Sequence, residues 1–159
     1  MELEFKPVVA GDIDRLRPFY GLRPNKTCDS VFLDSFLWKD YYHVQCAVSE
    51  GRAVLWLMGK DGQVSTAMPL CREEDLPYFF QQMVDYFSGV LHKPFYISLA
   101  DEEAVQCLNL DPALFEVEEQ VDLKDYLYSG EELRKLEGKK FVKKRNHLNR
   151  FKRTYEGRY

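Results

Sequence analysis

The spacing of apolar and polar side chains predicts short strands and helices in the first part of the chain. Leu3–Val9 alternates between the two kinds of side chain, as a half-buried strand does, and Asp12 can cap a short helix that follows. Residues 28–42 carry aromatic and leucine side chains at helical spacing behind two possible caps, Asp29 and Ser30. We therefore expect one strand followed by two short helices.

Three strand-like runs come next, over residues 42–51, 52–59 and 63–71. Turn residues separate these runs, and the pair Asp61-Gly62 is a strong signal for a tight hairpin between the second and the third. The pattern predicts an antiparallel meander of three strands.

Residues 72–93 are the clearest predicted helix, because acidic side chains occupy the first turn, where the helix dipole favours them, and a broad apolar face follows. The rest of the pattern predicts a buried strand over residues 95–100, a short capped helix over 101–110 and one or two strands over 114–129. The apolar face of the long helix consists of Leu76, Phe79, Phe80, Met83, Val84, Phe87 and Leu91.

The order of these elements predicts an α+β fold. Strands and helices follow one another as β, α, α, β, β, β, α, β, α, β, with a basic helix at the C-terminus. Such an order gives a mixed, mainly antiparallel sheet flanked by helices, and it matches the GNAT acyltransferase layout. We expect this GNAT-like domain to occupy residues 1–137.

Charge divides the chain at this point. Residues 138–159 contain nine Lys or Arg and a single acid, Glu156, which gives a net charge of +8. Residues 1–137 contain 13 basic and 25 acidic side chains, which gives −12. An asymmetry of this kind is typical of an arm that meets a polyanion or an acidic surface, although a solvated helix face would have the same composition.

The basic segment has two faces when its residues are placed at about 100° each around a helix. An apolar seam of Phe141, Leu148, Phe151 and Tyr155 lies on one side, which would allow the helix to dock on a core. Lys144 falls inside this seam, so its ammonium either reaches out to solvent or points toward an anionic group. A cationic face on the opposite side consists of Lys139, Lys143, Asn146, Arg150 and Arg153.

Positions 1–137 offer no recognisable catalytic constellation. The turn over Pro69–Pro77 lacks the glycines that would let a backbone approach the diphosphate of CoA, and it carries three acids there. Nucleophile-elbow and phosphate-loop patterns are absent, and neither the histidines nor the cysteines have metal-ligand spacing. We therefore expect no cofactor and no metal. We expect His43 to be a packed, hydrogen-bonded residue, and the scattered cysteines to be small buried hydrophobes.

The sequence also bears on where the protein is found. The first nine residues carry charges where a signal peptide needs an apolar run, and the longest apolar stretch, Ala53–Met58, is too short to cross a bilayer. We expect a cytoplasmic protein without a transmembrane segment.

Two stretches resemble a known family, the phosphatidylglycerol lysyltransferase C-terminal-like family of tandem GNAT-fold proteins. The first is Phe32–Val44, with Trp38 and Tyr42 as an aromatic pair before the meander. The second and more specific stretch contains the residues Asp125, Tyr126, Tyr128, Leu133, Leu136, Gly138, Lys139, Lys144, Arg145, Asn146, Asn149 and Phe151.

The resemblance implies a function. Characterised relatives transfer an amino acid from aminoacyl-tRNA to a lipid head group, and more distant relatives transfer it to a cell-wall precursor. In such proteins two GNAT-like domains lie side by side, and a long basic helix leads from the first into the second. The chain resembles the first domain plus this connector, residues 138–159, so we expect an N-terminal half that is inactive alone, with a second domain absent from it.

Taken together, these observations predict that residues of the basic helix bind tRNA or another polyanion. A second hypothesis is a non-catalytic interaction module whose apolar seam pairs with a second GNAT-like domain or with another copy of the chain. CoA-dependent acetylation is disfavoured by the glycine-free turn. The predicted anion- or nucleic-acid-binding residues are Lys139, Lys143, Lys144, Arg145, Asn146, Arg150 and Arg153.

Overall fold

The computed structural model describes residues 3–23, 31–124 and 127–158. The chain forms two compact units, unit 1 (Met1–Glu119) and unit 2 (Gln120–Tyr159). Each is described by itself below.

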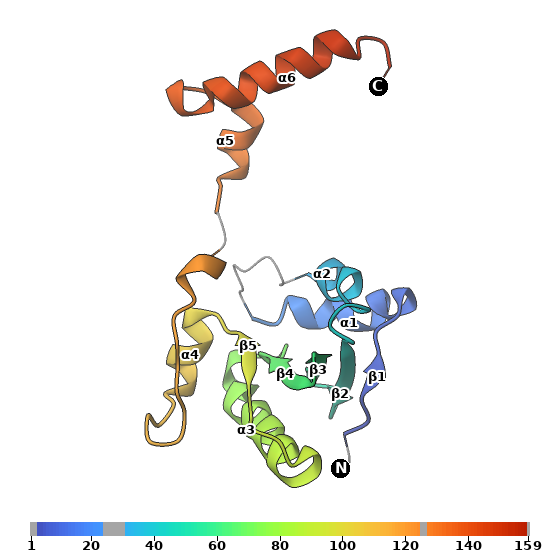
Figure 1. The fold of residues 1–159 in the computed structure, drawn as a ribbon, viewed down its shortest axis with the longest axis vertical. Coiled ribbons are helices and arrows are strands. Elements are labelled where there is room, and N and C mark those ends of the chain that lie inside the picture. The colour runs from blue at the N-terminus through green and yellow to red at the C-terminus, as the bar shows by residue number, and fades with distance from the viewer. Residues whose placement is uncertain (1–2, 24–30, 125–126, 159) are drawn as a thin grey trace. The chain divides into compact units, whose positions relative to one another are not determined.

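Unit 1 is built on a five-stranded sheet with the order β1-β2-β3-β4-β5 (Figure 1). Neighbouring strands from β1 to β4 are antiparallel, and β5 pairs parallel to β4 because α3 carries the chain across between them. The predicted meander is therefore confirmed as β2, β3 and β4, and the fold is α+β. The strands are β1 (Lys6–Pro7), β2 (Gln45–Ser49), β3 (Ala53–Lys60), β4 (Gln63–Ala67) and β5 (Ile97–Leu99).

Helices cover both faces of this sheet (Figure 1). On β3, Val54 and Trp56 belong to a core with α1 and α2, whereas Leu55 belongs to the core on the side of α3. This alternation follows from the two-residue period of a strand, and it explains why β3 is apolar on both faces. The covering elements are α1 (Ile13–Tyr20) and α2 (Phe32–Leu37) on one face, and α3 (Leu76–Tyr86) and α4 (Glu102–Leu108) on the other.

The predicted long helix is confirmed, with additional turns at both of its ends. A 3-10 turn, η2 (Glu73–Asp75), leads into α3, and a π-helical turn, η3 (Phe87–Leu91), extends it to His92. His92 adopts a left-handed conformation with φ 52°, which ends the helix where the sequence places Lys93 and Pro94. The buried face of this helix consists of Leu76, Phe79, Phe80, Met83 and Phe87.

The prediction of one or two strands over residues 114–129 is wrong for the residues of that range that the structure describes, 114–124 and 127–129. The described residues of that stretch contain only a 3-10 turn, η4 (Val121–Leu123). Phe115 packs on the ring of Phe80 at a centroid distance of 5.5 Å, but Val117 is 57% exposed. Alternating side chains form a strand only where a neighbouring strand pairs with the backbone, and no such neighbour is found among the described residues.

Two expectations near the N-terminus also need correction. The strand expected over Leu3–Val9 has only the two residues of β1 in ladder pairing. Asp12 lies at the N-cap position of α1, but its side chain makes no capping bond to that helix. Its Oδ2 accepts instead from the Val9 N–H at 2.9 Å, as part of the capping box of the preceding 3-10 turn, Ala10–Asp12. The proposed caps Asp29 and Ser30 lie outside the described residues.

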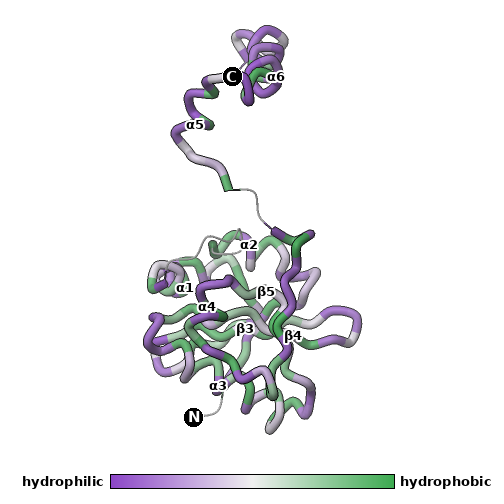
Figure 2. The backbone as a smooth tube through the Cα atoms, turned by 90° about the vertical axis from the view of Figure 1, so that its left-hand side faces the viewer, coloured by the Kyte–Doolittle hydropathy of each residue, from purple (hydrophilic) through white to green (hydrophobic). Residues whose placement is uncertain are grey.

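Unit 2 contains helices and turns and is mostly hydrophilic, whereas the strands of unit 1 are largely hydrophobic (Figure 2). Unit 1 contains 10 basic and 20 acidic side chains, a net charge of −10, and unit 2 contains 12 and 6, a net charge of +6. The elements of unit 2 are η4, α5 (Gly130–Lys135), a 3-10 turn η5 (Lys139–Phe141) and α6 (Val142–Thr154).

Candidate anion-binding helix

The basic helix begins at a sharp corner. Ser129 caps α5 by accepting from the Glu132 N–H, and α5 ends at Leu136 in a left-handed conformation. Gly138, with φ 81°, then turns the chain into η5, a conformation that a side chain at this position would disfavour. This corner sets the start of α6 at Val142.

Arg145 holds the corner together. Its Nη1 donates to the carbonyl of Gly138 at 2.9 Å and also to the carbonyl of Leu136. A cation beside the last carbonyls of a helix satisfies acceptors that lack an intrahelical partner and interacts well with the helix dipole. The structure thus gives this predicted anion-binding residue a partner in its own backbone.

Lys144 is exposed, and its Nζ lies 5.6 Å from the centroid of the Tyr128 ring. This distance is within the range of a cation–π contact. Of the two arrangements expected for Lys144, the one with its ammonium at the surface is present in unit 2.

The remaining predicted side chains point to solvent. Lys143, Asn146, Arg150 and Arg153 are spaced by three or four residues within α6, so they share one face of the helix. Lys139 is also exposed, but it lies in the preceding 3-10 turn and not in the register of α6. The sequence of α6 contains no acidic residue, so no carboxylate within the helix neutralises this face.

A surface hollow lies along part of the cationic face and is lined by Asn146, Asn149, Arg150, Lys152 and Arg153. The prediction had missed Asn149 and Lys152 as lining residues. Asn149 follows Asn146 by three residues and precedes Arg153 by four, so helical spacing alone could have found it. Guanidinium and amide N–H groups arranged in this way can donate to phosphate oxygens.

The apolar seam is divided in the structure. Phe141 lies in η5 and is 4% exposed, whereas Leu148 is 42% and Tyr155 45% exposed. When every residue is placed at 100° around one helix, these side chains fall on the same side. Phe141 belongs to the tighter 3-10 turn, however, where that angle does not hold. Phe151, which is 49% exposed, contacts the Tyr155 ring at a centroid distance of 4.9 Å.

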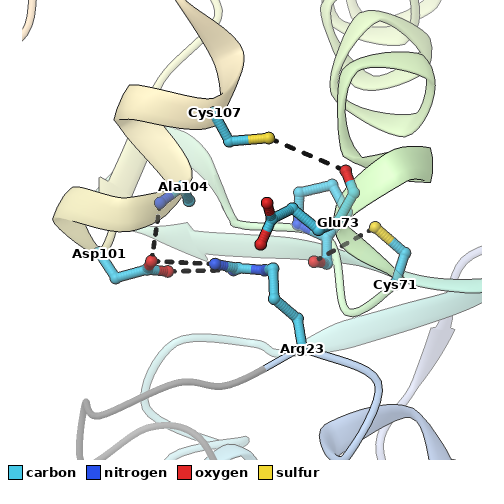
Figure 3. A network of polar contacts seen from close by, with 7 residues as sticks. Arg23, Cys71, Glu73, Asp101, Ala104 and Cys107 are labelled. Carbon is cyan, nitrogen blue, oxygen red and sulfur yellow. Dashed lines mark hydrogen bonds and ion pairs between the residues drawn. The ribbon is translucent and has the colours of Figure 1, made fainter.

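Unit 1 contains a buried ion pair between Arg23 and Asp101 (Figure 3). The two N–H···O bonds have lengths of 2.9 and 3.0 Å, and each side chain is 7% exposed. Asp101 also caps α4 by accepting from the Ala104 N–H at 2.9 Å. Burial alone would raise the pKa of Asp101, but the bonds from Arg23 and Ala104 outweigh this effect and lower it below its ordinary value. This arrangement is typical of a structural pair that fixes two segments.

The most strongly perturbed cysteine of unit 1 is held as a thiol by burial. Cys71 is buried, and this burial raises the pKa of its thiol to about 11, so the reactive thiolate is disfavoured. No group of three or more possible metal ligands occurs among the residues that the structure describes. His43 is exposed with φ 46°, which corrects the expectation that it is packed.

No helix within the described ranges has the length and apolar character needed to cross a membrane. The acids of the Pro69–Pro77 turn lie in η2, at the start of α3.

Comparisons with known proteins place the chain in a family. Residues 21–159 match the family described as "Phosphatidylglycerol lysyltransferase, C-terminal". No curated protein matches the chain. Among solved structures it is similar to a conserved protein of unknown function from Bacteroides thetaiotaomicron VPI-5482, with a TM-score of 0.81 and 25% sequence identity.

This similarity covers 98% of the present chain and 52% of the solved one, so the chain spans about half the length of that relative. The family match extends over the meander and the basic helix, and the GNAT-like description of the fold fits it. The chain therefore belongs to the phosphatidylglycerol lysyltransferase C-terminal family and is an acyltransferase-like module.

Proposed function

We propose that this chain is the N-terminal GNAT-like half of an aminoacyltransferase that takes its amino acid from aminoacyl-tRNA and passes it to a lipid or another acceptor. The observation that carries the proposal is the exposed cationic face of α6 in a member of a lysyltransferase family. In this proposal the cationic face holds the phosphates of the tRNA donor.

The electrostatics of unit 2 support this role. Lys143, Arg150 and Arg153 present three positive charges along one face of a helix that has no acid of its own. Several cations in a row can each neutralise a phosphate and release condensed counterions, which gives an affinity that depends steeply on salt. The net charge of −10 on unit 1 repels a polyanion, so contacts with RNA should be confined to unit 2.

We assign no catalytic residue in this chain. The solved relative is about twice as long, and we infer that transfer chemistry requires the part of such a protein that this chain does not match. The chain by itself should then bind tRNA without transferring an amino acid.

Retention of tRNA on the purified chain at low salt tests this function. The variant Lys143→Gln/Arg150→Gln should lose retention, because both side chains belong to the cationic face. The matched control is Lys135→Gln/Lys140→Gln, which removes the same charge from unit 2. Lys135 and Lys140 form ion pairs with Glu131 and Glu132, each at 2.7 Å, so this control should keep most of the retention. Equal retention by both variants, or none by the wild type, would contradict the proposal.

A second candidate function is a non-catalytic interaction module. The observation in its favour is the exposed part of the apolar seam, Leu148, Phe151 and Tyr155. Large apolar side chains in a row on a helix surface mark contacts with other proteins more often than single exposed ones do. The partner would be a second GNAT-like domain or another copy of the chain.

A further inference from the structure

In addition to the apolar seam of unit 2, unit 1 has an exposed apolar surface of its own, which the proposed RNA contact does not use. Its two leucines lie one helical turn apart on α2, and its aromatic residues belong to the turn that follows. We call this surface the aromatic platform: Leu33, Leu37, Trp38, Tyr41 and Tyr42, which are 60%, 66%, 49%, 52% and 37% exposed.

The platform is held in one arrangement. The rings of Trp38, Tyr41 and Tyr42 contact one another at centroid distances of 4.7 to 6.0 Å. Lys60 lies with its Nζ 4.1 Å from the centroid of the Tyr41 ring and donates to the hydroxyl of that residue. The carbonyl of Tyr42 accepts from the Gly59 N–H at 2.7 Å, which fixes the turn to β3. A preformed surface of this kind loses little conformational entropy when a partner binds.

The chemistry of the platform selects the class of partner. Its two most exposed members, Leu33 and Leu37, are aliphatic, so it suits apolar side chains better than stacked bases. Unit 1 has a net charge of −10, which disfavours RNA and anionic membranes and favours a cationic partner. Trp and Tyr are also the residues that dominate protein interfaces.

The chain itself carries a helix of that chemistry. Leu148 on α6 and Tyr155, which directly follows α6, are 42% and 45% exposed, and the segment 138–159 that contains them has a net charge of +8. We propose that the aromatic platform of one copy receives the exposed apolar seam of α6 from a second copy, and that two such contacts close a symmetric dimer. The inference rests on the interaction-module function described above. A two-fold dimer satisfies both surfaces of both copies without forming an open chain.

Two charge-introducing variants, Leu37→Glu and Leu148→Glu, test the pairing by sedimentation of the full chain. The wild type should dimerise, and each variant alone should weaken the dimer at least about tenfold, because both of its contacts are broken. Mixing the two variants should restore part of the dimer, because the heterodimer has one intact contact. Both substituted side chains are exposed, so each variant should keep the wild-type circular dichroism spectrum.

Several outcomes would overturn the proposal. One is a monomeric wild type, and another is a mixture no more dimeric than either variant. A dimer lost in Leu37→Glu but intact in Leu148→Glu would mean that platforms pair with each other. Trp38 fluorescence gives an independent reading, since Trp56 is 4% exposed and responds little to partners. A blue shift with neutral lipid vesicles, or quenching by single-stranded RNA, without any shift on self-association would assign the platform to those ligands.

The test separates this inference from the RNA-binding proposal. Leu37→Glu leaves every cation of α6 in place, so tRNA retention should be unchanged in that variant. A chain that retains tRNA but stays monomeric would overturn only the dimer.

Discussion

The two units of this chain are stabilised in different ways. Unit 1 buries side chains on both faces of a sheet, with Phe79 and Phe87 among those fully removed from water. In unit 2, Phe141 is the one large apolar side chain that is buried among those the structure describes. Hydrogen bonds and ion pairs at the α5–α6 corner supply the other stabilising contacts. Unit 1 therefore has a core of its own, whereas unit 2 presents most of its apolar and cationic side chains to whatever binds it.

Removing a core side chain should give the largest effect. Phe79 is fully buried in α3, so Phe79→Ala should lower the free energy of unfolding by about 3–5 kcal/mol, because it removes apolar packing and leaves a cavity. Phe151→Ala, in the exposed seam of unit 2, is the matched control and should cost less than about 1 kcal/mol. Urea unfolding followed by Trp56 fluorescence measures the loss in unit 1, and hydrogen exchange of the α6 amides measures the loss in unit 2. Similar costs would mean that the two units do not differ as described.

Breaking the buried ion pair should give the second largest loss of stability. Arg23→Met leaves the Asp101 carboxylate buried without its cation, which should cost about 3 kcal/mol. Adding Asp101→Ser removes the stranded charge and keeps an oxygen that can cap α4, so the double variant should be more stable than Arg23→Met. If both variants unfold at the same urea concentration, the pair is not the source of the loss.

The corner of unit 2 should give a smaller and local effect. Arg145→Ala removes the cation that donates to the carbonyls of Leu136 and Gly138, at a cost of about 1–2 kcal/mol. Hydrogen exchange of the amides in α5 and η5 should speed up, while exchange in unit 1 stays the same. Faster exchange throughout the chain would show that the units are coupled.

Acid should weaken the buried ion pair of unit 1, a small effect with a definite sign. The pKa of Asp101 is lower in the folded chain than in the unfolded one, so the folded state binds fewer protons at acidic pH. Its contribution is full above about pH 4, the unfolded carboxyl range, and is lost as the pH falls through the folded pKa. Melting temperatures below about pH 4 should therefore fall more steeply for the wild type than for Asp101→Ser. Parallel curves would contradict this.

Local patterns were enough to predict the central part of unit 1. The hairpin at Asp61-Gly62 and the apolar face of α3 are encoded within a few residues, and both are present in the fold. The segment 114–129 has the same alternation as a strand, but pairing requires a neighbour that the pattern cannot reveal. Arg23 and Asp101 are 78 residues apart, so no local signal joins them.

The basic helix shows a similar limit. Its cationic spacing could be read from the sequence, because Lys143, Asn146, Arg150 and Arg153 lie in one regular helix. The position of Phe141 could not be read from the sequence, because η5 changes the turn angle just before α6. The role of Arg145 could not be predicted either, because it depends on where α5 ends.

The salt dependence of tRNA binding tests the central claim most directly. For the wild type, the logarithm of the affinity should fall linearly with the logarithm of the salt concentration, as expected when counterions are released. The slope should become shallower by about 2 in Lys143→Gln/Arg150→Gln, one unit for each phosphate that no longer meets a cation, and should stay unchanged in Lys135→Gln/Lys140→Gln. Equal slopes in the two double variants would contradict the claim that the cationic face of α6 holds the RNA.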